Sequence, residues 1–334
     1  MEYYFIDLFS SFSCLAGACP DTCCLGWDIL VSGKDYERFL EMEPVWLREN
    51  ILGHIQKKGQ EYYFKRNKDG DCMMLEEDGL CRIQRNTSEE MLCNTCRKYP
   101  RIYWKNEECM YFSMAASCPV VSRLLLNDMP SFYKQAEEGN RTKLSIHKLP
   151  FCAEVLSFAE QMHRERNRNL QHTEKVRFVP AYFEKLADIL LDFILAEHVP
   201  KRDEILELLS YYETDMEEQA DFEIFHQETW ERWQQVAESY FKYRIYSRYL
   251  ECPEESAGDN YIQVCGELSV FYLFIFLKRM SVPRLLEEDW REMLGLMYRF
   301  AVHGVKRTEK LHKAFRVFFH NIYQWDFMIF DNHF

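Results

Sequence analysis

Cysteine is the residue whose number and spacing in this chain point most directly to chemistry. Ten of the 13 cysteines in the 334-residue sequence lie between residues 14 and 118. They are Cys14, Cys19, Cys23, Cys24, Cys72, Cys81, Cys93, Cys96, Cys109 and Cys118. The same segment contains one histidine, His54. Because thiolates that are close in sequence can converge on one metal without long loops, this spacing favours metal ligation.

The expected compartment supports that interpretation of the cysteines. The first residues, "MEYYFIDLFSSFSC", lack the basic stretch of a signal peptide. The longest apolar run, residues 270–277, is far shorter than the roughly 20 residues that span a bilayer. We therefore expect a cytoplasmic protein with no membrane partner. Disulfides are rare there, so the thiols are expected to be metal ligands or reactive groups; the alternative is a set of small buried hydrophobic residues.

Composition limits the class of partner. The formal net charge is −13, from 54 acidic and 41 basic residues. No Lys/Arg cluster is long enough to neutralise many phosphates, so we expect no nucleic-acid partner. A basic or lysine-presenting partner is compatible with this charge. The hydrophobic content of 47% is enough for a compact fold with one or two cores, and it sets no oligomeric state.

Helical periodicity dominates the chain beyond about residue 125. In residues 183–198 the apolar side chains recur at spacings of three and four, which is typical of a helix with a broad buried face. Further helices are expected at 150–164, 204–212, 226–249, 262–281, 287–302 and 306–323. The run "SVFYLFIFLKRM" at 269–280 is typical of a buried core helix. We therefore predict a helical domain over residues 126–334.

The first 125 residues are expected to form a more irregular, cysteine-rich metal-cluster domain. Helices are expected at 33–57 and after Pro119. The fold class predicted for the whole chain is mainly α. An irregular cysteine-rich part with a short β-hairpin would pack on an all-helical C-terminal part.

The expected hairpin covers residues 72–84. The Asp-Gly dipeptide at 78–79 is a strong signal for a two-residue turn. In a regular ladder Glu76 would oppose Cys81, and Cys72 would lie about 13 Å away along the same face. One small metal site could not easily bind both cysteines. The pattern therefore favours two separate sites, or a hairpin that bends early.

Four stretches of the sequence resemble one known family. They are "FSCLAGACPDTCCLGW" (12–27), "DGLCRIQ" (78–84), "TCRKYPR" (95–101) and "SCPVVSRL" (117–124). In this order they resemble the flagellin lysine-N-methylase (FliB) family, within the wider YkgJ-like group of CxxCxxCC-type zinc- or iron-chelating proteins. The resemblance covers residues 1–125, and the remainder is similar only in its general helical character.

The family pattern implies metal ligands at eight positions of this chain. They are Cys14, Cys19, Cys23, Cys24, Cys72, Cys81, Cys96 and Cys118. Cys93 and Cys109 match no family position and are weaker candidates. Eight ligands make two sets of four, which would fit two clusters or one cluster and a zinc ion. Adjacent residues of an extended chain point to opposite sides, so Cys23 and Cys24 would serve different sites, or only one of them would be a ligand.

The resemblance implies an iron–sulfur cluster and methyl transfer. All-thiolate ligation suits both a [4Fe–4S] cluster and zinc. We favour the cluster because zinc sites more often recruit a histidine. The implied reaction transfers a methyl group from S-adenosylmethionine to surface lysines of flagellin. Presenting a neutral lysine amine at pH 7 costs about 4.6 kcal/mol, so the site must lower that cost.

No catalytic or donor-binding residue is assigned by the sequence. It lacks a glycine-rich loop after an expected strand, and it lacks the CxxxCxxC signature of radical S-adenosylmethionine enzymes. An alternative function is therefore a non-enzymatic metal-cluster protein with a structural or redox-sensing role. A third is radical chemistry at the cluster.

Overall fold

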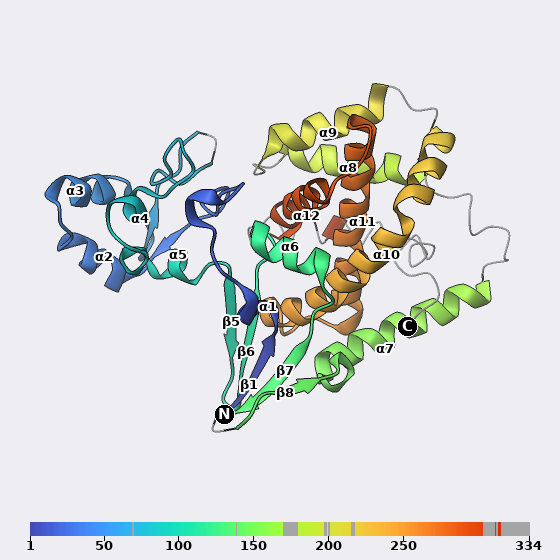
Figure 1. Ribbon diagram of the computed structural model, residues 1–334, viewed down its shortest axis with the longest axis horizontal. Coiled ribbons are helices and arrows are strands. Elements are labelled where there is room, and N and C mark those ends of the chain that lie inside the picture. The colour runs from blue at the N-terminus through green and yellow to red at the C-terminus, as the bar shows by residue number, and fades with distance from the viewer. Residues whose placement is uncertain are drawn as a thin grey trace.

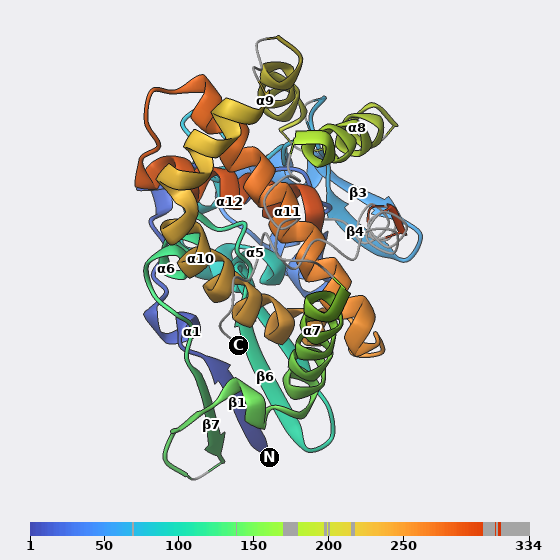
Figure 2. The ribbon, with the colours of Figure 1, turned by 90° about the vertical axis from the view of Figure 1, so that its right-hand side faces the viewer.

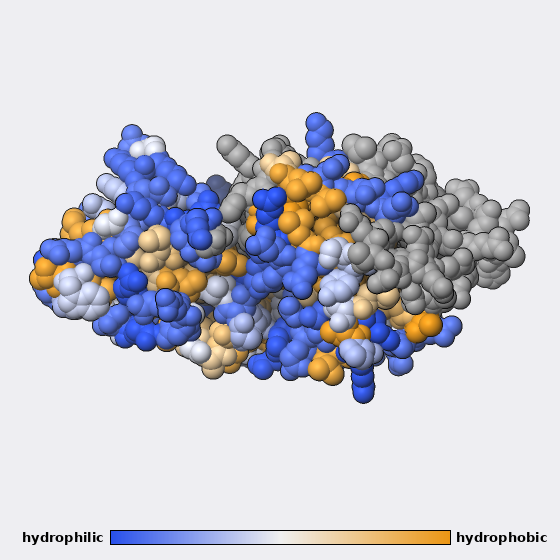
Figure 3. Space-filling model, turned by 90° about the horizontal axis from the view of Figure 1, so that it is seen from above, coloured by the Kyte–Doolittle hydropathy of each residue, from blue (hydrophilic) through white to orange (hydrophobic). Residues whose placement is uncertain are grey.

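The structure is a computed structural model that describes residues 1–68, 70–137, 139–169, 180–196, 199, 201–214, 218–302, 311, 313 and 314. Three parts follow one another across Figure 1: a lobe of residues 14–100 on the left, a sheet in the centre and helices on the right. We call the first part the cysteine lobe. Hydrophilic residues cover most of the described surface in Figure 3, with hydrophobic patches between them.

The cysteine lobe has its own small sheet and hydrophobic core. Its strands β2 (Leu30–Val31), β3 (Ile55–Lys58) and β4 (Glu61–Phe64) pair antiparallel in the order β2-β4-β3. Its helices are α2 (Gly33–Leu40), α3 (Val45–Gly53), α4 (Arg82–Asn86) and α5 (Asn94–Lys98), with short 3-10 turns at Ala16–Ala18 (η1) and Glu89–Met91 (η2). The predicted single helix at 33–57 is wrong: Pro44 separates two helices, because its ring removes a backbone donor from a continuing helix, and residues 55–58 form a strand.

The predicted hairpin at 72–84 bends early. Gly79 N donates a hydrogen bond to Glu76 O at 2.9 Å, so a turn forms where the sequence places one. Its register differs by one residue, because Leu75 rather than Glu76 lies opposite Cys81. A second turn, closed by Leu75 N donating to Cys72 O at 2.9 Å, ends the ladder. The prediction of a regular hairpin is therefore wrong, and the structure confirms the alternative of a hairpin that bends early.

A five-stranded sheet that the sequence does not predict joins the lobe to the helices. Its order is β5-β6-β1-β7-β8, with β1 parallel to β6 and the other pairs antiparallel. The strands are β1 (Glu2–Ile6), β5 (Arg101–Lys105), β6 (Cys109–Met114), β7 (Phe132–Ala136) and β8 (Thr142–Leu144). Short α1 (Leu8–Ser11) follows β1. Because β7 and β8 lie beyond residue 125, the described chain is all-helical only from about residue 150; the domain boundary at 125 stays a prediction.

The helices confirm a mainly α fold. They are α6 (Pro119–Asn127), α7 (Pro150–Asn169), α8 (Pro180–Ala196), α9 (Arg202–Thr214), α10 (Glu218–Glu251), α11 (Ala257–Ser281) and α12 (Glu287–Val302), with a 3-10 turn η3 (Ile146–Lys148) before α7. Each helix predicted between residues 150 and 302 is present, and the one at 306–323 lies almost wholly outside the described residues.

Helix α11 is the centre of the helical part (Figure 2). It is long and apolar enough to cross a membrane by composition, but 94% of its apolar window is buried inside the protein. Phe271, Phe274 and Phe276 on this helix are fully buried. The predicted core helix is therefore confirmed.

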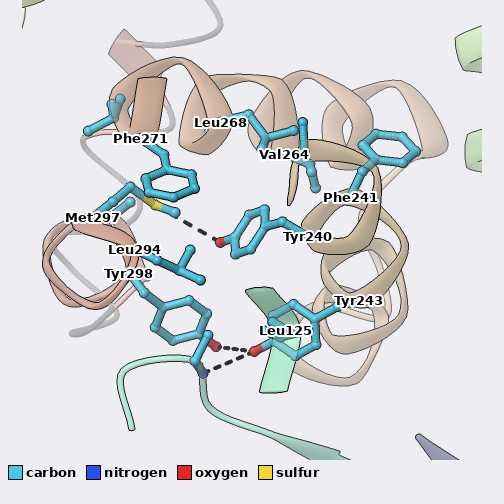
Figure 4. Packing of buried hydrophobic residues seen from close by; sticks show 14 of the residues in the cluster. Leu125, Tyr240, Phe241, Tyr243, Val264, Leu268, Phe271, Leu294, Met297 and Tyr298 are labelled. Carbon is cyan, nitrogen blue, oxygen red and sulfur yellow. Dashed lines mark hydrogen bonds between the residues drawn. The ribbon is translucent and has the colours of Figure 1, made fainter. Parts of the chain in front are cut away.

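Tyrosines of the helical core form hydrogen bonds with the backbone just before Cys118 (Figure 4). The Tyr243 hydroxyl donates to Met114 O at 2.6 Å and accepts from Ala116 N at 3.1 Å. It also lies 3.2 Å from the Tyr298 hydroxyl. These bonds fix the end of β6 just before Cys118, so the helical part positions one side of the candidate site.

Candidate metal centre

Thiols from three separate segments meet in the core of the cysteine lobe. Cys24, Cys72 and Cys93 are buried there, and Cys81 and Cys96 pack against them. We call these five the inner cysteine group. Cys72 N donates to Cys24 O at 2.9 Å, and the Cys93 thiol donates to Cys96 Sγ at 3.4 Å. The early bend at 72–84 brings Cys72 and Cys81 together, which a regular hairpin would not do.

Burial disfavours negative charge in the inner group. It raises the pKa of the Cys72 thiol to about 12, and nearby Cys81 and Cys93 act in the same direction. The hydrogen bond with Cys93, followed by burial, raises the pKa of Cys96 well above its usual range. The shifts favour the neutral form of Cys72 and Cys96, whereas the hydrogen bond with Cys96 lowers the pKa of Cys93. A bound metal ion would reverse this, because its charge deprotonates a coordinating thiol outright.

A second set of thiols, the outer cysteine group, consists of Cys14, Cys19 and Cys118. Burial raises the pKa of Cys118 to about 11, and the thiols of Cys19 and Cys14 add to the effect. Cys118 directly precedes α6, with Pro119 as the first helical residue. The loop that carries Cys14 and Cys19 lies at the side of the cysteine lobe that faces α6 (Figure 1).

Cys23 lies between the two groups. Cys23 is exposed, whereas its sequence neighbour Cys24 is buried. A hydrogen bond with Cys24 lowers the pKa of Cys23 to about 7, and the positive charge of Arg299 acts in the same direction. The Cys19 thiol is also influenced by Cys23. The adjacent cysteines therefore differ in exposure but contact each other.

Arg299 of α12 reaches from the helical part into the cysteine loop. Its Nη2 donates to Asp21 Oδ2 at 2.8 Å, to Thr22 O at 2.8 Å and to Ser117 O at 3.2 Å. Arg299 is only 2% exposed. One buried guanidinium therefore ties together two segments that carry cysteines, from a position 278 residues along the chain.

Helix α2 supports the segment that carries Cys93 and Cys96. Buried Asp35 accepts a hydrogen bond from Asn94 N at 3.0 Å. Arg38 Nη2 donates to Asp35 Oδ1 at 2.9 Å and to Leu92 O at 2.7 Å. The start of α5 is thus held by partly buried, charge-assisted bonds, which are stronger than neutral ones.

The donor set fits a thiophilic metal centre. All eight predicted ligands lie in or between the two groups. Cys93, which the family pattern left out, also lies in the inner group, and its C-x2-C spacing with Cys96 is the signal that could have identified it. Cys109 pairs with Glu2 in the central sheet. Within the described ranges, no three His, Cys, Asp or Glu side chains already surround one metal position.

Sequence comparisons show which proteins the chain is similar to. No family model and no solved structure matches the chain. The chain belongs to the family of the flagellar biosynthetic protein FliU, because it is 32% identical to FliU of Salmonella muenchen over 40% of this chain and 82% of that relative. It is also 33% identical to the lysine-N-methylase of Salmonella typhimurium (strain LT2) over 35% of this chain. The chain spans only 30% of the length of that lysine-N-methylase.

Proposed function

We propose that this protein is an S-adenosylmethionine-dependent protein-lysine N-methyltransferase that modifies surface lysines of flagellin in the cytoplasm, with a cysteine-ligated iron–sulfur cluster. The observation that carries the proposal is the gathering of nine thiols, from Cys14 to Cys118, in a chain similar to proteins named lysine-N-methylase. The relative named for flagellar biosynthesis supports a flagellar substrate.

The two cysteine groups would hold the metal centre or centres. We favour a [4Fe–4S] cluster, which needs four thiolates. Zinc is the second candidate, because the Cys93 and Cys96 sulfurs are 3.4 Å apart, close to the roughly 3.8 Å between two thiolates on one tetrahedral zinc. When bound, the centre would supply the positive charge that stabilises these thiolates, and its binding energy would add to the stability of the lobe.

Methyl transfer to flagellin is the expected activity of the reconstituted protein. Protein purified and reconstituted without oxygen, incubated with radiolabelled S-adenosylmethionine and flagellin, should place label on flagellin lysines. Flagellin whose lysines have been acetylated is the matched control and should remain unlabelled. Unlabelled lysines in the presence of an intact metal centre would contradict the proposal.

A non-enzymatic, redox-sensing role is the second candidate function. The Cys93 and Cys96 sulfurs, 3.4 Å apart, need to move only slightly to reach the roughly 2.05 Å of a disulfide. Oxidation of this pair would remove two thiolates from the inner cysteine group. Release of the metal on oxidation, together with the absence of lysine methylation, would favour this redox-sensing role.

Arg299 is expected to support the metal centre without binding it. Arg299→Gln should weaken metal binding about 10–100-fold, because outer groups that orient ligands have effects of that size. The measurement is the rate and extent of metal loss to a chelator under anaerobic conditions. Arg284→Gln, an exposed arginine just before α12, is the control. Equal metal retention in both variants would show that Arg299 does not position the cysteine loop.

A further inference from the structure

A cavity of about 240 Å³ lies where the cysteine loop meets the helical part. The loop side contributes Pro20, Asp21 and Ser117, and α12 contributes Glu288, Arg291 and Glu292. Lys201 and Glu204, around the start of α9, complete the charged lining. The cavity therefore combines side chains from the cysteine-bearing loops and from the helices α6, α9 and α12.

This cavity shares a wall with the outer cysteine group. Pro20 and Asp21 directly follow Cys19, and Ser117 directly precedes Cys118. The carboxylate of Asp21 is close enough to Cys19 to influence its thiol. A group bound in the cavity would therefore lie beside the proposed metal centre.

The charge of the lining favours a cation. Four carboxylates and two cationic side chains surround the cavity, which is a formal net charge of −2. Three of the four carboxylates already have cationic partners: Lys201 lies 3.1 Å from Glu204 and 3.8 Å from Asp21, Arg299 lies 2.8 Å from Asp21, and Lys278 lies 3.3 Å from Glu292. Glu288 makes no ion pair within the described part of the chain, so it is the lining carboxylate open to a further cation. The Glu204 and Glu292 side chains are each 49% exposed, so the mouth can be reached from solvent. Complementary charge steers a partner to such a site and selects its sign.

Gly295 of α12 lines the cavity and leaves space beside the helix. A Cβ built on this glycine would meet no atom within 4 Å. A glycine inside a helix costs about 1 kcal/mol of stability relative to alanine. No close neighbour requires a glycine at position 295. The open position leaves room for a slender ligand along the helix.

We propose that this cavity binds the ε-ammonium side chain of the substrate lysine, an inference that rests on the proposed function. Its volume is below the roughly 300–1,000 Å³ of pockets that enclose a drug-sized ligand, and it suits a single extended side chain. The exposed carboxylates at its mouth lie where a lysine on a protein surface can reach them. Flagellin would thus present its lysine next to the outer cysteine group.

Filling the cavity provides the sharper test. Gly295→Leu would place a large side chain in the open space. Gly295→Ala is the matched control, because it adds only a Cβ and raises helix propensity by about as much as leucine does. The leucine variant should raise the KM for flagellin at least roughly tenfold and weaken flagellin binding by the same factor, with metal content and melting temperature unchanged. The alanine variant should match the unmodified protein.

Neutralising the mouth provides an independent test. The double variant Glu288→Gln/Glu292→Gln should weaken flagellin binding roughly tenfold, the effect of losing two partly exposed ionic contacts. Glu49→Gln/Glu254→Gln, which changes net charge equally at two exposed glutamates elsewhere, should leave binding unchanged. Binding is measured without methyl donor, by titration of flagellin and of lysine-acetylated flagellin.

The outcomes separate the cavity from the proposed activity. Lysine-dependent binding that is lost in both cavity variants, with no methyl transfer in the unmodified protein, would support the cavity and contradict the enzyme. Methyl transfer with the same KM in Gly295→Leu and Gly295→Ala would support the enzyme and overturn the cavity as the lysine site.

Discussion

Replacing Glu267 with alanine is expected to lower the free energy of unfolding by about 3–5 kcal/mol, because the buried Arg244 guanidinium would lose its fully buried partner and keep only the partly exposed Glu251. The side chains of Glu267 and Arg244 are both fully buried. Glu267 Oε2 accepts from Arg244 Nε at 2.7 Å and from the Tyr240 hydroxyl at 2.8 Å. Gln263 Nε2 donates to the other carboxylate oxygen at 3.3 Å.

Denaturant unfolding of matched variants measures this effect. Glu238→Ala on the same helix as Arg244 removes a partly exposed ion pair with Lys242, and should cost less than about 1 kcal/mol. Replacing Arg244 and Glu267 together with methionine should recover much of the loss, since no fully buried charge of this pair then remains and Glu251, which loses Arg244, is partly exposed. Equal losses in Glu267→Ala and Glu238→Ala would show that the buried pair contributes no more than a surface pair.

Replacing Cys24 with serine is expected to remove the metal centre of the inner cysteine group. A serine hydroxyl is a poor ligand for a thiophilic metal, and losing a direct ligand should exceed the roughly 100-fold upper effect of outer groups. Cys24 is buried beside Cys72 and Cys81, in the interior of the inner cysteine group. The lobe should also lose stability, since metal binding and folding are coupled.

Metal content per chain after anaerobic purification measures the Cys24 effect. Cys109→Ser is the control, because Cys109 lies in β6 of the central sheet and pairs with Glu2. This variant should keep the metal content of the unmodified protein. The same metal content in Cys24→Ser and Cys109→Ser would remove Cys24 from the ligand set.

Local patterns in the sequence predict the helical part well. Helix α12 begins at 287 and ends at 302, as the apolar spacing indicates, and α11 is buried as its continuous apolar run indicates. Both patterns are complete within one helix, so no knowledge of distant contacts is needed. The cysteine spacing likewise indicates thiol convergence, because the short gaps limit how far the thiols can separate.

Non-local contacts are what the sequence could not reveal. Strand β1 is five residues long and pairs in parallel with β6, more than 100 residues later, so no local window shows both partners. The hairpin register differs because the connecting turn closes between Gly79 N and Glu76 O, and a second turn at Cys72 ends the ladder. Arg299 carries no motif, and its role follows only from the 2.8 Å contact with Asp21. Sites assembled by such contacts require a structure.

The central claim is that the clustered thiols bind metal, and it is tested most directly by elemental and acid-labile sulfide analysis of protein kept from oxygen throughout purification. We predict about four irons and four sulfides for each [4Fe–4S] cluster bound per chain, with a cysteine lobe that unfolds when a chelator removes the iron. Protein that contains neither iron nor zinc, and whose cysteine lobe is nevertheless stably folded, would contradict the account.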